Sequence, residues 1–232
     1  MPLNKSKGNM YPWVTHTHTH LGGECPHKCT YCYVDNPRFG RPERYQGELR
    51  LIRKELEVNY RQGKTIFIDN CNDLFAEDVI REDLIDVLRH CKKYPDNTYV
   101  FQTKNPRRYL DYDVQTNLPP QRILGATIET NRKIECSKAP DPIDRARGMI
   151  DLKDKKFITI EPIMDFDFPA LLSWINQINP DFVNIGADSK GRGMPEPRAK
   201  KVTQLIESMN HLGIEIRGKH NLERLLNPPK GE

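Results

Sequence analysis

The sequence predicts an α/β fold with a mostly parallel sheet, and three observations support this prediction. Short stretches rich in β-branched residues alternate with longer stretches of helical periodicity. Their lengths suit βα units, in which a helix joins two parallel strands. Neither a linker nor a break in composition interrupts the alternation, so we expect a single domain over residues 1–232. A full barrel, a partial barrel and an open doubly wound sheet all agree with six or seven such units.

The first half of the chain opens with residues 1–13, which we expect to be a poorly ordered N-terminal lead-in. Residues 14–21 alternate and are rich in threonine, which predicts a strand. Residues 22–45 contain glycine, proline and cysteine and predict a long loop, and residues 47–62 predict a helix that ends at Gly63. The same reasoning predicts a strand at 65–69, a helix at 78–94 with Ile80, Leu84, Val87, Leu88 and Cys91 on one stripe, and a strand at 98–103 followed by a short helical loop.

The second half keeps the same alternation. The expected strands are 123–129, 156–163, 181–187 and 214–219, and the expected helices are 142–152, 168–178 and 196–213. Parallel strands place their carboxyl ends at one edge of the sheet. Polar residues that follow these strands are therefore expected around one mouth.

Composition and charge exclude several classes of protein. The chain has 36 basic and 32 acidic residues and a net charge of +4, which permits an anionic partner without requiring one. No apolar stretch approaches the roughly 20 residues that span a bilayer, and no apolar run follows the N-terminus as in a secretory signal. We therefore expect a cytoplasmic protein without a membrane partner. Neither G-x-G-x-x-G nor G-x-x-x-x-G-K occurs, which argues against a dinucleotide dehydrogenase and a P-loop NTPase.

Three cysteines lie directly after the first expected strand, at Cys25, Cys29 and Cys32. Thiolates are the usual ligands of iron–sulfur clusters, and three on one short loop can each hold one corner of a cubane. The fourth iron then stays open to a substrate or cofactor, as in a catalytic zinc site. A structural zinc site, completed by Cys71, Cys91 or Cys136, is the alternative, although no second cysteine knuckle is present.

The spacing C-x3-C-x2-C, with Tyr31 before the last cysteine, resembles the signature of the radical S-adenosylmethionine superfamily. The resemblance implies a partial (βα)6 TIM-like barrel and a [4Fe–4S] cluster whose fourth iron is chelated by S-adenosyl-L-methionine. It further implies a one-electron reductant such as flavodoxin or ferredoxin, and a 5′-deoxyadenosyl radical that abstracts hydrogen from the substrate. The stretches WVTHT, GECPHKCTYCY, DNCNDLF, QTKNP, GATIE, TIEPI and NIGAD look like the phage-associated Gp37/Gp68 family, whose members are largely uncharacterised.

Polar residues at the strand ends are candidates for cofactor binding. The superfamily carries a Gly-Gly-Glu motif after its second strand, which binds the amino group of the cofactor, and this chain lacks it. Asn70, Asn72 or Asp73 would take its place. Glu129 is a candidate for the ribose or the amino group, and Glu161 for the cofactor or the substrate. The full candidate set is Tyr31, Tyr33, Asn70, Asn72, Asp73, Thr103, Lys104, Glu129, Glu161 and Asn184. For each residue, capping and solvation of a loop is the alternative role.

Two further cysteines are candidate hydrogen donors to a product radical. Cys71 follows a strand end and Cys136 lies in a loop after Glu129, although an inert small side chain is the alternative for each. Cys91 is expected in the core. Three histidines, His16, His18 and His20, are spread over roughly 13 Å of strand, too far for one ion. We expect hydrogen-bonded interior histidines, with His20 near the cluster.

An arginine-rich stretch follows the cysteines and combines Arg38, Arg41 and Arg44 with Phe39 and Tyr45. Arginine forks bind phosphates and aromatic rings stack on bases, although a solvated loop is an equal alternative. This stretch favours a nucleic-acid base or nucleotide as the substrate of a modification, rearrangement or repair reaction. A radical enzyme acting on a peptide, a protein or a small metabolite remains open, as does a non-catalytic zinc or iron–sulfur module that binds nucleic acid.

Overall fold

The computed structural model describes residues 3–7, 10–34, 43–189 and 191–227. An eight-stranded sheet runs in the order β1-β2-β5-β6-β7-β8-β9-β10. Every neighbouring pair from β2 to β10 is parallel, and β1 is antiparallel to β2. The strands are β1 (Asn4–Lys5), β2 (His16–His18), β5 (Thr65–Ile68), β6 (Thr98–Thr103), β7 (Arg122–Thr127), β8 (Lys156–Ile160), β9 (Phe182–Ile185) and β10 (Glu215–Gly218). The predicted α/β class with a mostly parallel sheet is confirmed.

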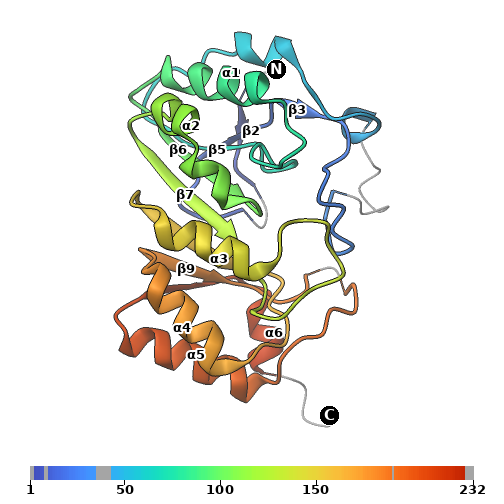
Figure 1. Ribbon diagram of the computed structural model, residues 1–232, viewed down its shortest axis with the longest axis vertical. Helices are drawn as coiled ribbons and strands as arrows, with labels where there is room; N and C mark the ends of the chain where they lie inside the picture. The colour runs from blue at the N-terminus through green and yellow to red at the C-terminus, as the bar shows by residue number, and fades with distance from the viewer. Residues whose placement is uncertain (1–2, 8–9, 35–42, 190, 228–232) are drawn as a thin grey trace.

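Helices join the parallel strands and cover the outer face of the sheet. They are α1 (Arg81–Lys92), α2 (Tyr112–Asn117), α3 (Pro142–Asp151), α4 (Phe168–Ile178), α5 (Ala199–His211) and α6 (Leu222–Leu226), with 3-10 helices η2 (Glu43–Tyr45), η3 (Arg53–Glu57) and η4 (Pro106–Leu110). Figure 1 shows α1 to α5 following one another along the long axis, while the long loops after the strands gather on the opposite side. No helix among the described residues is long and apolar enough to cross a membrane.

The inner face of the curved sheet changes from apolar to polar along the strands. Phe67, Val100, Phe157 and Phe182 form an apolar cluster inside the barrel, separate from the larger core under the helices. The parallel register then places polar side chains further along the same faces, because successive inward residues lie two apart. These are Gln102, Thr127, Thr159 and Asn184. The carboxyl end of the barrel is therefore the polar end, where the sequence predicts the site.

The N-terminal lead-in differs from the prediction. In the described part of residues 1–13, β1 pairs with β2, and Tyr11 is 5% exposed. The Tyr11 ring stacks on Trp13 at 5.4 Å between centroids and meets Phe157 edge-on at 6.0 Å. Tyr11 and Trp13 thus pack against the apolar cluster inside the open barrel. Their packing depends on partners far along the chain, and so short a stretch has no periodicity to reveal them.

The predicted helix at 47–62 is wrong. The structure has β4 (Arg50–Leu51), which pairs with β3 (Leu21–Gly22) in a separate two-stranded sheet, followed by the short helix η3. Glu55 in η3 is buried, because Arg44 and His18 bind its carboxylate. These distant polar contacts outweigh a helical pattern that has few apolar positions.

The strand predicted over 14–21 is divided. β2 ends at His18, and the backbone N–H groups of His20 and Leu21 donate to the Asp69 carboxylate at 2.7 and 3.0 Å instead of continuing the ladder. The Asp69 carboxylate accepts the backbone N–H groups that would otherwise donate to a neighbouring strand, so the strand ends at this point. In α1, the predicted stripe holds for Cys91, which is fully buried, but Ile80 lies before the helix and is exposed.

Candidate functional site

A cavity of about 630 Å³ opens at the carboxyl ends of the parallel strands. Cys25, Cys29 and Cys32 line it together with residues from the ends of β5, β6, β7, β8, β9 and β10. Of the residues predicted from the sequence, those that line it are Tyr31, Tyr33, Asn70, Cys71, Asn72, Asp73, Thr103, Lys104 and Glu161. Glu129, Asn184 and Cys136 are not among the lining residues. The structure therefore brings the three cysteines and most of the predicted strand-end residues to one cavity.

The cysteine loop is held from two directions. On one side, His27 Nε2 lies 2.7 Å from Asp73 Oδ2, after β5. On the other, the loop after β7 contributes the carbonyl of Cys136, which accepts from Thr30 N at 2.9 Å, and Ser137 Oγ, which lies 3.1 Å from Cys29 Sγ. Cys136 thus contacts the cysteine loop through its backbone, and the three thiols are placed by segments far apart in the sequence.

Asp73 connects the cysteine loop to the end of β6. Its Oδ2 accepts hydrogen bonds from Thr103 Oγ1 at 3.0 Å and Lys104 N at 2.8 Å in addition to the His27 contact. Burial alone would raise the pKa of Asp73, but the nearby His27 together with the hydrogen bonds from Lys104 and Thr103 lowers the pKa overall. Asn72 is equally occupied, because its amide donates to Gly23 O and accepts from Asp73 N. Both side chains therefore act within the protein scaffold.

Glu129 lies at the centre of a second buried group. Its side chain is fully buried, and Arg145 Nη1 donates to Oε2 at 2.7 Å. Lys104 Nζ and Tyr31 OH both donate to Oε1. Burial would raise the pKa of Glu129, but Lys104 and Arg145 lower it to about 2, so the carboxylate stays charged. Lys104 and Tyr31 lie between Glu129 and the cavity, since they line it and Glu129 does not. Arg145 is a member of this group that no strand-end pattern could reveal.

His18 at the end of β2 and His20 after it form the interior network that the sequence predicts. His16, by contrast, is only partly buried, and its Nδ1 lies 2.9 Å from Thr15 Oγ1. Tyr60 OH bridges His18 Nδ1 at 2.7 Å and His20 Nε2 at 2.8 Å, and His18 Nε2 lies 2.9 Å from Glu55 Oε2. His20 also contacts Asp69 at 3.1 Å. None of these histidines lines the cavity, so the expected position of His20 beside the cluster is not found.

Cys71 lies in the wall beside Tyr33. Tyr33 OH is 3.5 Å from Cys71 Sγ and donates to Asn70 O at 2.6 Å, and Asn70 Nδ2 also lies 3.5 Å from Cys71 Sγ. Asn70 Oδ1 has a long contact of 3.4 Å with Thr19 Oγ1. Asn70 Nδ2 also donates to Tyr33 OH at 3.2 Å. Of the three residues that could replace Gly-Gly-Glu, Asn70 therefore has the longest side-chain contacts, since those of Asn72 and Asp73 are 3.1 Å or shorter.

The opposite wall contains Glu161, Lys219 and Tyr11. Lys219 Nζ donates to Glu161 Oε2 at 2.7 Å and lies 5.2 Å from the centre of the Tyr11 ring. Burial and the nearby Glu161 raise the pKa of Tyr11 well above its ordinary value, so its hydroxyl stays protonated. Sequence reasoning missed Tyr11 because it precedes every predicted element.

Asn184 belongs to the floor below this wall. Its amide lies 3.3 Å from Thr159 Oγ1, which also contacts Tyr11 OH at 2.8 Å. Tyr11 OH is 2.8 Å from Gln102 Oε1, and Gln102 donates to Thr127 at 2.8 Å. The floor is therefore a layer of polar side chains that satisfy one another.

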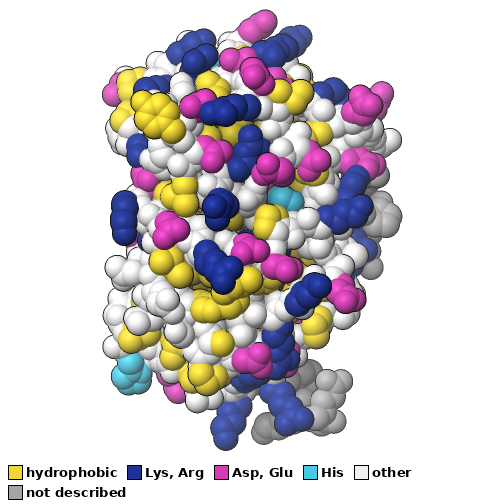
Figure 2. Space-filling view, viewed as in Figure 1, with side chains coloured by type: hydrophobic (Ala, Val, Ile, Leu, Met, Phe, Trp, Pro, Cys, Tyr) yellow, Lys and Arg dark blue, Asp and Glu magenta, His cyan; other side chains and the backbone are white. Residues whose placement is uncertain are grey.

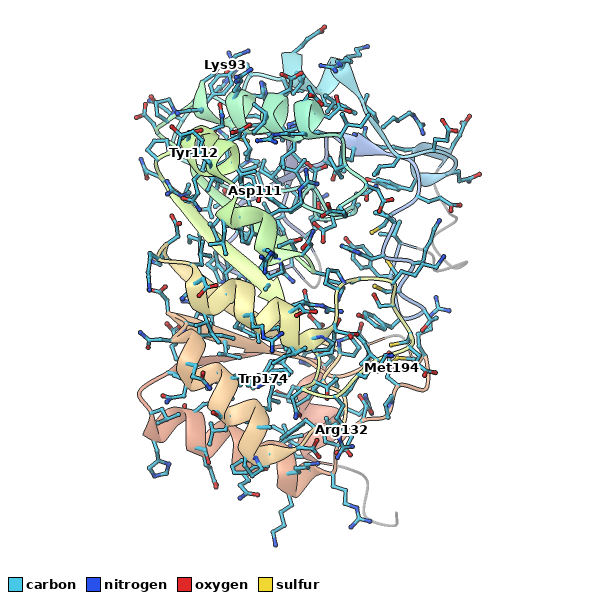
Figure 3. The ribbon with its side chains drawn as sticks, viewed as in Figure 1. Lys93, Asp111, Tyr112, Arg132, Trp174 and Met194 are labelled. Carbon is cyan, nitrogen blue, oxygen red and sulfur yellow. The ribbon has the colours of Figure 1, made fainter. Side chains whose placement is uncertain are left out.

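The rim on the β7–β9 side is braced by charges. Arg132, after β7, donates to Asp167 Oδ1 at 2.6 Å and pairs with Asp165, both of which follow β8. Asp165 N in turn donates to Pro195 O at 2.6 Å. Figure 3 places Arg132 and Met194 on the side of the molecule where these loops gather, away from Tyr112 on the helical side.

The arginine-rich stretch is only partly placed. Arg38, Phe39 and Arg41 lie outside the described residues. Arg44 donates to Glu55 Oε1 at 2.7 Å and to the carbonyl of Thr19, so it is committed within the protein. Tyr45 lines the cavity. The expected phosphate contact by Arg44 is therefore not supported.

The three thiols suit a cluster in their chemistry. Burial, the charge of Asp73 and the neighbouring thiols raise the pKa of Cys25 to about 12, so a bare thiolate is unfavourable there. A metal centre deprotonates coordinating thiols outright, and its positive charge compensates the thiolate in place of the lost proton. Among the described residues, no three His, Cys, Asp or Glu side chains converge on a single ion. Convergence is not needed for a cubane, because each thiolate binds a different iron.

No family model and no curated protein matches the chain. Solved structures share its fold. A spore photoproduct lyase double mutant with bound AdoMet and dinucleoside spore photoproduct is 12% identical, with a TM-score of 0.53 over 88% of this chain and 63% of that one. SuiB of Streptococcus suis bound to the precursor peptide SuiA is 10% identical, with a TM-score of 0.60 over 88% and 48%.

SuiB bound to S-adenosylmethionine is 11% identical, with a TM-score of 0.58 over 94% of this chain and 53% of that one. The chain thus spans about half to two thirds of the length of these proteins. The likeness confirms the partial TIM-like barrel. The narrower resemblance to the Gp37/Gp68 family stays a prediction.

Proposed function

We propose that the chain is a radical S-adenosylmethionine enzyme. The observation that carries this proposal is that Cys25, Cys29 and Cys32 line one cavity at the polar end of a partial barrel. Structures with the same fold hold S-adenosylmethionine or AdoMet, as their descriptions state. The three thiolates would hold three irons of a [4Fe–4S] cluster, with the fourth left for the cofactor. When bound and reduced by a one-electron donor such as flavodoxin or ferredoxin, the cluster and cofactor supply a hydrogen-abstracting adenosyl radical.

The chain's own residues would orient the cofactor. Asn70 is the best replacement for the missing Gly-Gly-Glu motif, because its side-chain contacts are longer than those that hold Asn72 and Asp73 within the scaffold. Lys104 and Tyr31 line the cavity, and both are hydrogen-bonded to the buried Glu129. Glu129 would therefore act by fixing these two side chains. Thr103 would contribute indirectly, because its hydroxyl holds Asp73.

Cys71 is the proposed hydrogen donor to a product radical. It lines the cavity beside Tyr33, whereas Cys136 does not line it and is not proposed. Replacement of Cys71 by Ala should preserve cofactor cleavage but divert or block product formation, because a thiol S–H is the removed group. Unchanged product yield with the Cys71→Ala variant would exclude this role.

A nucleic-acid base or nucleotide is the proposed substrate. Aromatic side chains of Tyr33 and Tyr45 line the cavity and offer surfaces on which a base can stack. One structure of the same fold holds a dinucleoside, although another holds a peptide. On the face seen in Figure 2, basic and acidic side chains are interspersed, so we expect recognition at the cavity mouth and not over this helical face.

The test begins with anaerobic reconstitution. With dithionite and S-adenosylmethionine, the protein should form 5′-deoxyadenosine and methionine, slowly even without substrate. The absence of 5′-deoxyadenosine with an intact, reduced cluster would identify an electron carrier, and a colourless zinc-loaded protein would identify the non-catalytic module. Incubation with single-stranded oligonucleotides and with peptides, each deuterated, then separates the substrates, since deuterium enters 5′-deoxyadenosine only from the molecule that is attacked.

A further inference from the structure

The carboxyl ends of β8 and β10 contribute a charged pair to the cavity wall. Lys219, after β10, and Glu161, after β8, lie 2.7 Å apart with side chains 15% and 17% exposed. Both line the cavity. Partly burying an ion pair seldom stabilises a fold, because desolvation offsets the attraction. The pair is therefore better explained by what it presents to the cavity.

Three elements fix this pair in place. Gly186, after β9, leaves the space that Glu161 occupies, since a Cβ there would come within 2.8 Å of Glu161 Cδ. The backbone N–H of Lys219 donates to Ile185 O at 2.8 Å, and its ammonium lies over the Tyr11 ring. Tyr11 is itself held by Gln102 and Thr159. The two charged groups are thus pre-positioned, which lowers the entropic cost of binding a ligand.

The pair keeps hydrogen-bonding capacity that the floor lacks. A lysine ammonium has three donors, and Lys219 uses one on Glu161 Oε2. Among the described residues, no side chain or backbone group donates to Glu161 Oε1. The polar floor below, from Tyr11 to Asn184, is by contrast paired within itself. The wall therefore presents one cationic donor beside one anionic acceptor.

We infer that Glu161 and Lys219 read the Watson–Crick edge of an unpaired nucleobase in the substrate. On that edge every natural base carries an N–H donor next to a nitrogen or oxygen acceptor, so the N–H would donate to Glu161 and Lys219 would donate to the acceptor. Unpaired bases are commonly recognised on this edge once they leave the helix. The inference rests on the proposed function and assigns its substrate class. The adenine of the cofactor has the same edge, so the experiment must separate the two.

The experiment measures nucleotide binding to the reconstituted holoenzyme by anaerobic equilibrium dialysis. The probes are the four deoxynucleoside 5′-monophosphates and their counterparts methylated at N1 of the purines or N3 of the pyrimidines. We expect at least one nucleotide to bind, and its methylated form to bind about 10-fold or more weakly, because a hydrogen bond to a charged group is lost. In the Glu161→Gln/Lys219→Met variant, which removes both charges together, the ratio should fall to about 1. Binding of no nucleotide, or equal binding of both forms to the wild type, overturns the inference.

A matched control is the pair Arg122–Asp154, which lies outside the cavity lining and is about as exposed as the tested pair, at 24% and 14%. The Arg122→Met/Asp154→Asn variant should keep the wild-type ratio. If the Glu161/Lys219 variant raises the KM for S-adenosylmethionine more than it weakens nucleotide binding, the pair belongs to the cofactor's adenine and the inference falls. Iron content and 5′-deoxyadenosine formation of the wild type are measured in the same samples. If the wild type holds no iron and forms no 5′-deoxyadenosine, the proposed function is overturned. If it does both but binds the methylated and unmethylated nucleotides equally, only this inference is overturned. The wild-type ratio still decides if the double variant fails to fold.

Discussion

The wall formed by β2, β5, β6 and β7 buries its carboxylates, whereas the wall formed by β8 and β10 leaves its carboxylate partly open. Asp69, Asp73 and Glu129 are at most 6% exposed, and each has two or more hydrogen-bond partners within the protein. Glu161 faces the cavity with Lys219 as its partner. The first wall thus uses charge to fix the backbone around the cysteines, and the second keeps charge available to a ligand.

This difference suggests a division of labour between the two walls. A cluster needs three thiols at fixed positions, and the loop that carries them has little regular structure of its own. Buried, fully paired carboxylates supply the rigidity, because breaking any one contact leaves an uncompensated charge. A substrate wall needs the opposite property, since a group that is already satisfied cannot recognise a ligand.

Replacement of one of the three cysteines should have the largest effect, because it removes a ligand of the cluster that the first wall holds in place. Replacement of Cys25, Cys29 or Cys32 by Ala should reduce iron from about four per chain to a small residue, because each thiolate holds one corner of the cluster. Iron and sulfide analysis after anaerobic reconstitution checks this. Cys91→Ala is the control, since Cys91 is buried in α1 and should affect only packing. A full cluster in all three single variants would remove the basis of the proposed function.

Glu129→Gln tests the rigid wall and should lower the free energy of unfolding by about 3–5 kcal/mol, because Arg145 is left buried without its counter-ion. Chemical denaturation measures the change. The exposed pair Asp144–Arg147 gives the control, and Asp144→Asn should cost less than about 1 kcal/mol. The folded-state pKa of Glu129 is about 2, below its ordinary value of 4.5. The stabilisation that the Glu129 carboxylate provides is therefore present above pH 4.5 and is lost as the pH falls towards 2. The free energies of unfolding of the wild type and the Glu129→Gln variant should converge at that low pH.

Tyr11→Phe tests the second wall at its base. Loss of the hydroxyl leaves Gln102 Oε1 and Thr159 with one partner fewer, which should cost about 1–3 kcal/mol. Thermal or chemical unfolding measures this loss. Tyr112→Phe is the matched control, because Tyr112 is 80% exposed on α2 and its substitution should be neutral. Equal effects of the two substitutions would show that the N-terminal segment does not hold the barrel interior.

The arginines give the smallest expected effect. Arg38 and Arg41, whose positions lie outside the described residues, stay predicted phosphate contacts, and their joint replacement by Gln should reduce the log–log salt slope of single-strand binding by about 1.4. Arg44→Gln should leave the slope unchanged and lower stability, because Arg44 pairs with the buried Glu55. Titrations of fluorescent DNA at several salt concentrations distinguish the two. A lower salt slope with Arg44→Gln would show that Arg44 contacts the nucleic acid.

The sequence by itself determined the alternation of strands and helices and the position of the cysteine loop, because periodicity and spacing are local properties. Strand β6 and helix α4 begin and end at the predicted residues. It also indicated which residues follow the strand ends, and parallel topology then brings those ends to one edge. What the sequence could not give was the difference between a residue that lines the cavity and one that supports it, as between Lys104 and Glu129.

Only the tertiary structure decided the elements whose partners are distant. In the described part of the lead-in, Tyr11 is held because it meets Phe157 and Thr159 across the barrel. Residues 47–62 fail to form a helix because Arg44 and His18 bind Glu55. The pairing of Glu161 with Lys219 spans 58 residues and depends on the empty space at Gly186. Hydrogen bonds and ion pairs depend on distance in space, and a sequence records only distance along the chain. Such contacts appear only when the sheet has curved and brought its strand ends together.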